Sequence, residues 1–160
     1  MTTTSTHQTE ITADAKVPLV RIVREFDASP EKVFRAHTDP ELVAQWLAPG
    51  QTQMRIDHFD CRTGGSYRYT HHDDSGEYGF HGSFHEVRPS EAIVQTFTFD
   101  GMPDGVALET IRFEALGDRR TRLVSTSLCD SFEGRDAFIA SGMEEGVVAC
   151  YEQLDELLAR

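Results

Sequence analysis

Seven histidines in the 160-residue sequence invite a search for a metal site. His81 and His85 are four residues apart in an expected strand, which separates them by about 13 Å at about 3.3 Å per residue. His71 and His72 are neighbours and point to opposite faces of a strand. Zinc needs three or four ligands that converge on one ion, and these spacings offer no such set. The sequence therefore predicts no metal and no cofactor.

Nucleophilic catalysis needs a Ser or Cys next to a base and an oxyanion hole. The sequence contains no Gly-x-Ser-x-Gly elbow, and Gly82-Ser83 lies inside an expected strand rather than at a strand-to-helix turn. The three cysteines lack metal-type spacing. No residue is therefore predicted to be catalytic. Glu109 beside a tyrosine leaves acid–base chemistry of a cyclase or hydrolase kind as an alternative.

Acidic residues outnumber basic ones, 27 Asp and Glu against 15 Lys and Arg, for a formal net charge of −12. A protein that binds nucleic-acid phosphates needs clustered Lys and Arg, so nucleic acids and anionic membranes are unexpected partners. No apolar run approaches the roughly 18 residues of a membrane span, and the first residues lack the regions of a signal peptide. Together with an odd number of cysteines, Cys61, Cys129 and Cys150, these features predict a cytoplasmic protein.

Hydrophobic periodicity indicates the elements that must position the polar side chains. Residues 1–16 are rich in Thr and carry no apolar pattern, so they are expected to be a disordered tail. Residues 17–27 alternate like a strand. Ser29-Pro30 and Asp39-Pro40 each have the residue types that begin a helix. Two short helices are therefore expected directly after the first strand.

Turn signals divide residues 51–130 into β-rich runs. These are residues 52–61, 66–72, 78–87, 92–99, 106–116 and 121–128. Loops this short join antiparallel strands, because a parallel crossover needs a dozen residues or more. Helical spacing returns in a short helix over residues 133–140 and a long one over 142–159. Residues 17–160 are therefore expected to be one α+β domain, with a curved antiparallel sheet wrapped around the C-terminal helix.

Four segments together resemble the START-like, helix-grip superfamily, also called SRPBCC proteins. The closer resemblance is to its branch named after the activator of the heat-shock-protein-90 ATPase. The segments are FDASPEKVFRAHTDPELVAQWL (26–47), RTGGSYRY (62–69), FHGSFHEVRPSEAIVQTFTF (80–99) and ASGMEEGVVACYEQLDELL (140–158). The chain departs from the family's pattern at Leu47, where many members have an aromatic residue, and at Val147, where many have Trp. The superfamily includes lipid carriers, hormone receptors, polyketide cyclases and a cochaperone, so the resemblance implies a fold and no single reaction.

Strand alternation predicts a ligand-binding pocket between the sheet and the long helix. The more apolar face of each strand is expected to point at the helix, with a few polar groups among aromatic walls. The expected lining residues are Trp46, Phe59, Tyr67, Tyr69, His71, Phe80, Phe84, Gln95, Phe97, Phe99, Glu109, Ile111, Met143, Val147 and Tyr151. Both faces of residues 121–128 carry apolar side chains, so Ser125 and Ser127 line the pocket only if Leu123 points inward.

The sequence thus favours binding of a small hydrophobic or aromatic ligand. A filled core with an exposed apolar patch would instead indicate a cochaperone-like or other protein-interaction module. A third reading is a cofactor-independent enzyme, which predicts Glu109 within hydrogen-bond reach of a Tyr or His. Trp46 either plugs the open end of the sheet or touches a ligand at its mouth. A homodimer is left open.

Overall fold

The computed structural model describes residues 7–160, and the first six residues of the expected tail lie outside that range. The strands are β1 (Glu10–Ala13), β2 (Leu19–Phe26), β3 (Gln53–Phe59), β4 (Ser66–Asp73), β5 (Gly76–Arg88), β6 (Ala92–Phe99), β7 (Ala107–Ala115) and β8 (Thr121–Leu128). The helices are α1 (Pro30–Thr38), α2 (Pro40–Trp46), α3 (Phe132–Ala140) and α4 (Met143–Leu158). Every strand and helix expected between residues 17 and 160 is present, with ends shifted by a few residues.

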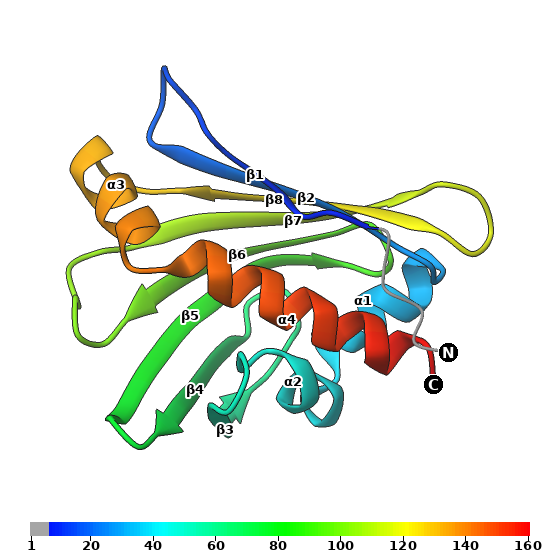
Figure 1. The fold of residues 1–160 in the computed structure, drawn as a ribbon, viewed down its shortest axis with the longest axis horizontal. Helices are drawn as coiled ribbons and strands as arrows, with labels where there is room; N and C mark the ends of the chain where they lie inside the picture. Colours follow the sequence, from blue (N-terminus) through cyan, green and yellow to red (C-terminus); the bar gives the residue numbers. More distant parts are fainter. Residues whose placement is uncertain (1–6) are drawn as a thin grey trace.

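The strands form one antiparallel sheet in the order β1-β2-β8-β7-β6-β5-β4-β3. The register shifts between Ile56 and His58 in β3 and between Phe84 and Glu86 in β5. Such irregularities bend and twist a strand. Figure 1 shows the sheet curling around α4, with α1 and α2 near the C-terminal half of that helix. The expected α+β helix-grip architecture is confirmed.

Side-chain caps begin the two short helices where the sequence predicted them. Ser29 accepts a hydrogen bond of 3.3 Å from the backbone N of Lys32 at the start of α1. Asp39 accepts one of 3.0 Å from the backbone N of Glu41 at the start of α2. Each cap satisfies a backbone donor that the helix itself leaves without a partner. The two helices are thereby held between β2 and β3, at one end of the sheet.

The long helix α4 supplies the centre of the core. Its buried residues recur at helical spacing and are Met143, Cys150, Tyr151, Leu154 and Leu158. Gly142 precedes the helix with a φ of 89°, a left-handed conformation that favours glycine and allows the sharp turn from α3. In the described part of the chain, no helix is long and apolar enough to cross a membrane.

The expected disordered tail is wrong for residues 10–13, which form β1. Glu10 pairs with Val23 and Ala13 with Val20 along the edge of β2. Strand pairing of this kind uses backbone N–H and C=O groups and needs no apolar pattern. In β1, the side chain of Ile11 packs against the core. A polar segment is therefore ordered by the edge strand beside it.

Candidate functional site

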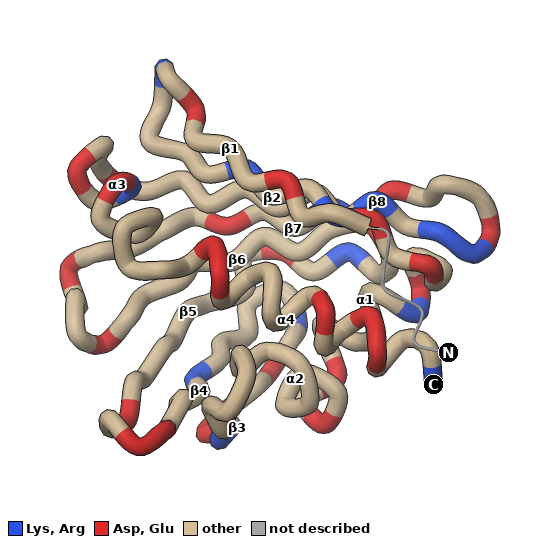
Figure 2. The backbone as a smooth tube through the Cα atoms, in the orientation of Figure 1, with Lys and Arg blue, Asp and Glu red and all other residues tan. Residues whose placement is uncertain are grey.

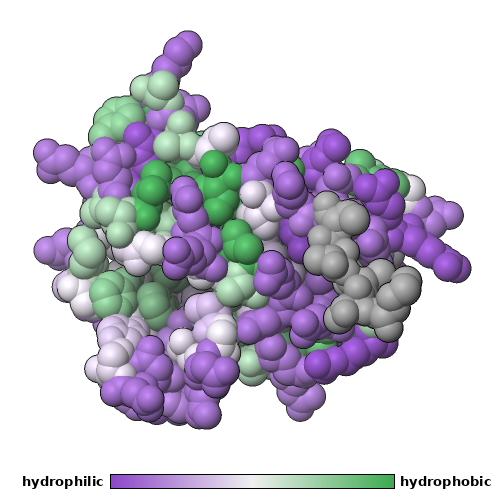
Figure 3. All heavy atoms as spheres, viewed as in Figure 1, coloured by the Kyte–Doolittle hydropathy of each residue, from purple (hydrophilic) through white to green (hydrophobic). Residues whose placement is uncertain are grey.

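A pocket of about 340 Å³ lies between the inner face of the sheet and α4. Its walls come from strands β2 to β8 and from all four helices, of which α1 and α3 contribute one residue each, His37 and Phe138. Nine of the lining residues are Phe, Tyr or Trp. Figure 3 shows apolar residues gathered on the molecular surface over the first half of α4, which forms one of these walls. We call this space the sheet–helix pocket.

Fourteen of the fifteen residues expected to line a pocket do so. They are Trp46, Phe59, Tyr67, Tyr69, His71, Phe80, Phe84, Gln95, Phe97, Glu109, Ile111, Met143, Val147 and Tyr151. The exception is Phe99, the last residue of β6, whose ring packs on the rings of Phe80 and Tyr78 at 5.4 and 6.4 Å. Phe99 has the inward parity of its strand but lies beyond the lining of the pocket, so its assignment was wrong.

The polar centre of the pocket is a row of three side chains across neighbouring strands. Gln95, Glu109 and Ser127 stand opposite one another in the β6, β7 and β8 register. Gln95 Nε2 donates to Glu109 Oε1 at 3.0 Å, and Ser127 Oγ donates to Glu109 Oε2 at 2.8 Å. Burial raises the pKa of Glu109, and these two hydrogen bonds oppose the rise. The carboxylate is therefore held by neutral donors.

Glu109 takes part in no ion pair among the described residues. The two buried arginines of the described residues bond elsewhere: Arg24 donates to Asp155 of α4, and Arg135 donates to Asp136. The enzyme alternative predicted a Tyr or His hydrogen-bonded to Glu109. Among the described residues, the hydrogen-bond partners of Glu109 are instead Gln95 and Ser127.

Three tyrosines share the pocket with Glu109. Tyr67 donates a hydrogen bond of 2.6 Å to the backbone oxygen of Thr96. Burial raises the pKa of Tyr67, Tyr69 and Tyr151, and the negative charge of Glu109 raises it further. All three are consequently neutral phenols near physiological pH, able to donate or accept a hydrogen bond.

Two histidines lie on the pocket wall, and both are kept neutral. Burial lowers the pKa of His37 to about 4, although its Nδ1 bonds to the backbone oxygen of Val33 at 2.8 Å. The His37 ring meets the rings of Trp46 and Phe113 edge-on at 4.8 and 5.2 Å. Burial also lowers the pKa of His71. Neither side chain brings positive charge to the pocket at neutral pH.

Trp46 is buried between the two short helices and also lines the pocket. Its indole Nε1 donates to the backbone oxygen of Ala36 at 2.8 Å, which anchors α2 on α1, and its ring lines the pocket. Gln153 of α4 donates from Nε2 to the backbone oxygens of Trp46 and Ala48 at 3.0 and 2.9 Å. The segment that follows α2 is thereby tied to α4, and it places Leu47 and Pro49 on the pocket wall.

Several lining residues were not assigned from the sequence. They are Ile22, His37, Val43, Leu47, Pro49, Ile93, Phe138, Gly146 and Cys150. Ile22 and Ile93 have the inward parity of their strands, so alternation was a sufficient signal for them. Ser125 and Ser127, left conditional, do line the pocket, and Leu123 is buried with them on the inner face of β8.

The described residues contain no group of three or more His, Cys, Asp or Glu able to hold a metal ion. The cysteines Cys61, Cys129 and Cys150 form no disulfide. Burial raises the pKa of Cys61 to about 11 and that of Cys150 to about 12, so the Cys150 thiol on the pocket wall is protonated and a poor nucleophile at neutral pH.

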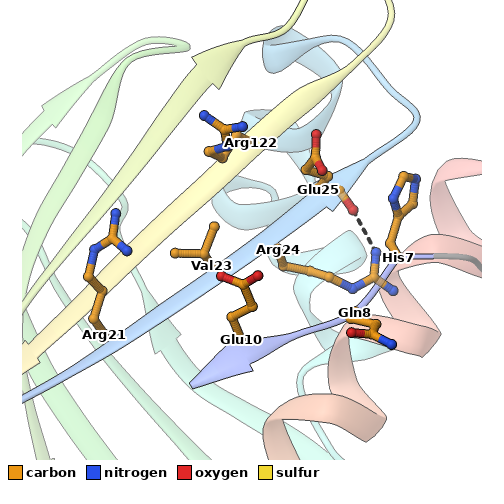
Figure 4. Close-up of a pocket in the computed structure, with 8 residues that line it drawn as sticks. All are labelled: His7, Gln8, Glu10, Arg21, Val23, Arg24, Glu25 and Arg122. Atoms are coloured by element: carbon orange, nitrogen blue, oxygen red, sulfur yellow. Dashed lines mark hydrogen bonds between the residues drawn. The ribbon is translucent and has the colours of Figure 1, made fainter. Parts of the chain in front are cut away.

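A second pocket, of about 280 Å³, lies beside β1, β2 and β8 (Figure 4). Its side chains are mostly polar and carry charges of both signs, with Glu10 and Glu25 near Arg21 and Arg122. Arg24, which also lines it, is engaged by the Glu25 backbone oxygen and by Asp155. This pocket has none of the aromatic walls of the sheet–helix pocket, and it contains no residue that the sequence singled out.

An antiparallel sheet that grips one long helix, with a pocket between the two, defines the helix-grip class of START-like proteins. The family model of Activator of Hsp90 ATPase homolog 1-like proteins matches residues 27–159. The chain belongs to this family. Both the superfamily and the branch expected from the four sequence segments are thereby confirmed.

Solved structures of similar proteins extend the likeness over most of the chain. Protein CV1439 from Chromobacterium violaceum is 30% identical, with a TM-score of 0.76 over 89% of this chain and 98% of its own. A protein from Rhodobacter sphaeroides is 25% identical, with a TM-score of 0.85 over 95% and 98%. One from Arthrobacter aurescens is 25% identical, with a TM-score of 0.85 over 94% and 91%. The comparison with curated proteins gave no match.

Proposed function

We propose that the chain binds a small apolar or aromatic molecule in the sheet–helix pocket. The observation that carries this proposal is the pocket itself, about 340 Å³ between the sheet and α4, with aromatic walls and a short polar row at its centre. Ligand sites are typically clefts of roughly 300–1,000 Å³ with mostly apolar linings and a few polar groups that orient the ligand. The pocket matches the small end of that range.

The apolar walls supply the driving force for binding. Micromolar affinity corresponds to about −8 kcal/mol. At about 25 cal/mol per Å², that energy requires burial of roughly 300 Å² of apolar surface, before the costs of association are included. A molecule of two or three fused rings offers surface of that order. Its polar groups must meet partners inside, because a buried polar group without a hydrogen bond is costly.

Fluorescence titration with the neutral apolar probe N-phenyl-1-naphthylamine tests the proposal. The wild-type protein is expected to bind it and to release it to competitors from a panel of flavonoids and polyketides. Phe97 lines the pocket and stacks on Phe80 at 5.5 Å, so Phe97→Ala is expected to weaken binding several-fold. Phe132→Ala is the matched control, because it makes the same substitution at a ring that is 44% exposed and lies outside the pocket lining, and it is expected to leave affinity unchanged.

A second pair of variants fills the pocket rather than enlarging it. Val147 of α4 lines the pocket, whereas its neighbour Val148 is 37% exposed. Val147→Trp is expected to occupy the space and abolish probe binding, while Val148→Trp adds the same ring at the surface and retains it. Absence of probe binding to folded wild-type protein would contradict the proposal.

One surface feature favours the protein-interaction module as the second candidate. Leu108 and Leu128 stand opposite each other in the β7–β8 register on the face away from α4, and they are 43% and 37% exposed. An exposed apolar pair of this kind is what an interaction surface predicts. A wild-type protein that binds no probe but loses a partner on Leu108→Ser would support this candidate. A homodimer and a cytoplasmic location stay predictions.

A further inference from the structure

The charge balance inside the sheet–helix pocket is one-sided. Among the described residues that line it, Glu109 is the only carboxylate, and there is no Lys or Arg. The two buried arginines of the described residues, Arg24 and Arg135, lie outside the pocket lining and form ion pairs with Asp155 and Asp136. His37 and His71 are neutral at neutral pH because burial lowers the pKa of both. The pocket thus holds one acidic group and no resident counter-charge.

The other polar groups of the pocket are neutral, and they leave some hydrogen-bond acceptor sites of Glu109 unoccupied. A carboxylate has about four lone-pair sites, and Gln95 and Ser127 each occupy one. Tyr69 and Tyr151 make no side-chain hydrogen bond within the described residues, although both lie in the same pocket. A ligand group that enters here therefore finds free acceptor sites on Glu109 beside uncommitted phenol oxygens.

The walls around Glu109 also favour positive charge. Trp46, Tyr67, Tyr69 and Tyr151 all line the pocket. The faces of aromatic rings attract cations, most strongly those of Trp and Tyr, and the attraction grows where water is excluded. Aromatic walls combined with one carboxylate form a common arrangement for recognising an ammonium group. An anionic ligand would instead face Glu109 with no cation to compensate it.

We infer, resting on the proposed function, that the ligand class of the sheet–helix pocket is a cationic amine with an apolar, aromatic body, its ammonium group donating to Glu109 and its body lying against the aromatic walls. The ligand then supplies the counter-charge that the fold does not. The acidic surface supports the same sign of ligand: Figure 2 shows Asp and Glu spread over α4 and the hairpin turns, consistent with the net charge of −12. Such a field attracts cations toward the protein.

Three molecules of one shape and different charge test this inference: 1-naphthylmethylamine, 1-naphthylmethanol and 1-naphthoate. Their affinities are measured by isothermal titration calorimetry at pH 7 and about 0.15 M salt, which screens the surface field beyond about 8 Å. Wild-type protein is expected to bind the amine at least tenfold more tightly than the alcohol, and the acid most weakly. Equal affinities for amine and alcohol, or preference for the acid, would overturn the inference and leave the proposed function intact. Binding of none of the three would contradict the proposed function itself.

Two variants locate the preference at one carboxylate. Glu109→Gln removes the charge and keeps the shape, so the ratio of amine to alcohol affinity is expected to fall to about one while alcohol binding persists. Glu114→Gln removes the same charge from the exposed face of the same strand, and it is expected to retain the wild-type ratio. A ratio that falls equally in both variants would mean that only the overall charge matters.

A spectroscopic measurement keeps the test decisive if Glu109→Gln does not fold. In wild-type protein, the side-chain amide of Gln95 donates to Glu109 and so reports on that carboxylate. The amine is expected to shift the Gln95 side-chain NMR signals more than the alcohol does. Equal shifts, or shifts confined to surface residues, would place the ammonium group away from Glu109.

Discussion

Ser127 stands directly opposite Glu109 in the β7–β8 ladder, and its hydroxyl donates a hydrogen bond of 2.8 Å to the carboxylate. Gln95 stands opposite Glu109 on the other side and donates a second. The sheet register alone thus brings the three polar side chains together. Two neutral hydrogen bonds offset only part of the cost of burying a charge. The ionised form of Glu109 is therefore unfavourable for the stability of the folded protein.

Glu109→Gln is expected to stabilise the protein more at pH 8 than at pH 4, because it removes a buried group that is charged only at the higher pH. The folded-state pKa of Glu109 lies above its ordinary value of 4.5 because burial disfavours the charged form. The folded protein then binds more protons than the unfolded chain, so the stability from this group is full below pH 4.5 and is lost as pH rises through the folded pKa. Urea unfolding at pH 4 to 8 should show the gain of the variant growing with pH. A gain independent of pH would contradict the assignment.

Leu154→Ala is expected to cost about 2–4 kcal/mol in free energy of unfolding, the usual range for a fully buried leucine. Leu154 is 0% exposed at the centre of the α4 stripe. Val148→Ala removes apolar volume from the exposed side of the same helix and is expected to change stability by less than about 0.5 kcal/mol. Denaturant unfolding of both variants measures the difference. Comparable costs would mean that α4 is rotated from the orientation described.

Strand alternation predicted most of the pocket because a side-chain period of two leaves only two choices of face. Tyr67 and Phe97 followed from that rule. It failed at Phe99, because parity sets the face and does not show where along the strand the helix stops covering it. The face of β8 could not be read from the sequence, since Leu123 and Val124 are both apolar. The strand register shows which face of β8 points inward, because Ser125 stands opposite Ile111, which also lines the pocket.

The pocket residues on helices and connecting segments were harder to predict. Val33, Phe34 and His37 share one side of α1, but a helical pattern does not say which neighbour that side meets. Leu47 and Pro49 reach the pocket because Gln153 binds backbone oxygens around them, a contact between segments about 100 residues apart. Side-chain-to-backbone contacts of this range leave no periodic signal in the sequence.

Asp155→Ala is expected to destabilise the protein by about 3 kcal/mol, because it leaves the buried charge of Arg24 without its partner. Arg24 is 2% exposed and donates to Asp155 through both terminal nitrogens, joining β2 to α4. Glu152→Ala, on the exposed side of the same helix, is the control and should cost less than about 0.5 kcal/mol. Chemical denaturation gives both values. The double variant Arg24→Met, Asp155→Leu should recover most of the loss, and failure to do so would mean that shape rather than charge pairing dominates there.

Deletion of residues 1–13 is expected to lower the Tm by about 4–8 °C, equivalent to about 2 kcal/mol for a domain of this size. The deletion removes β1, exposes the hydrogen-bonding edge of β2 and withdraws Ile11 from the core. Deletion of residues 1–6 leaves the residues of β1 in place and serves as the control. Amide hydrogen exchange should quicken along β2 only in the longer deletion. A Tm change below about 2 °C would mean that residues 10–13 contribute as little as the Thr-rich composition first indicated.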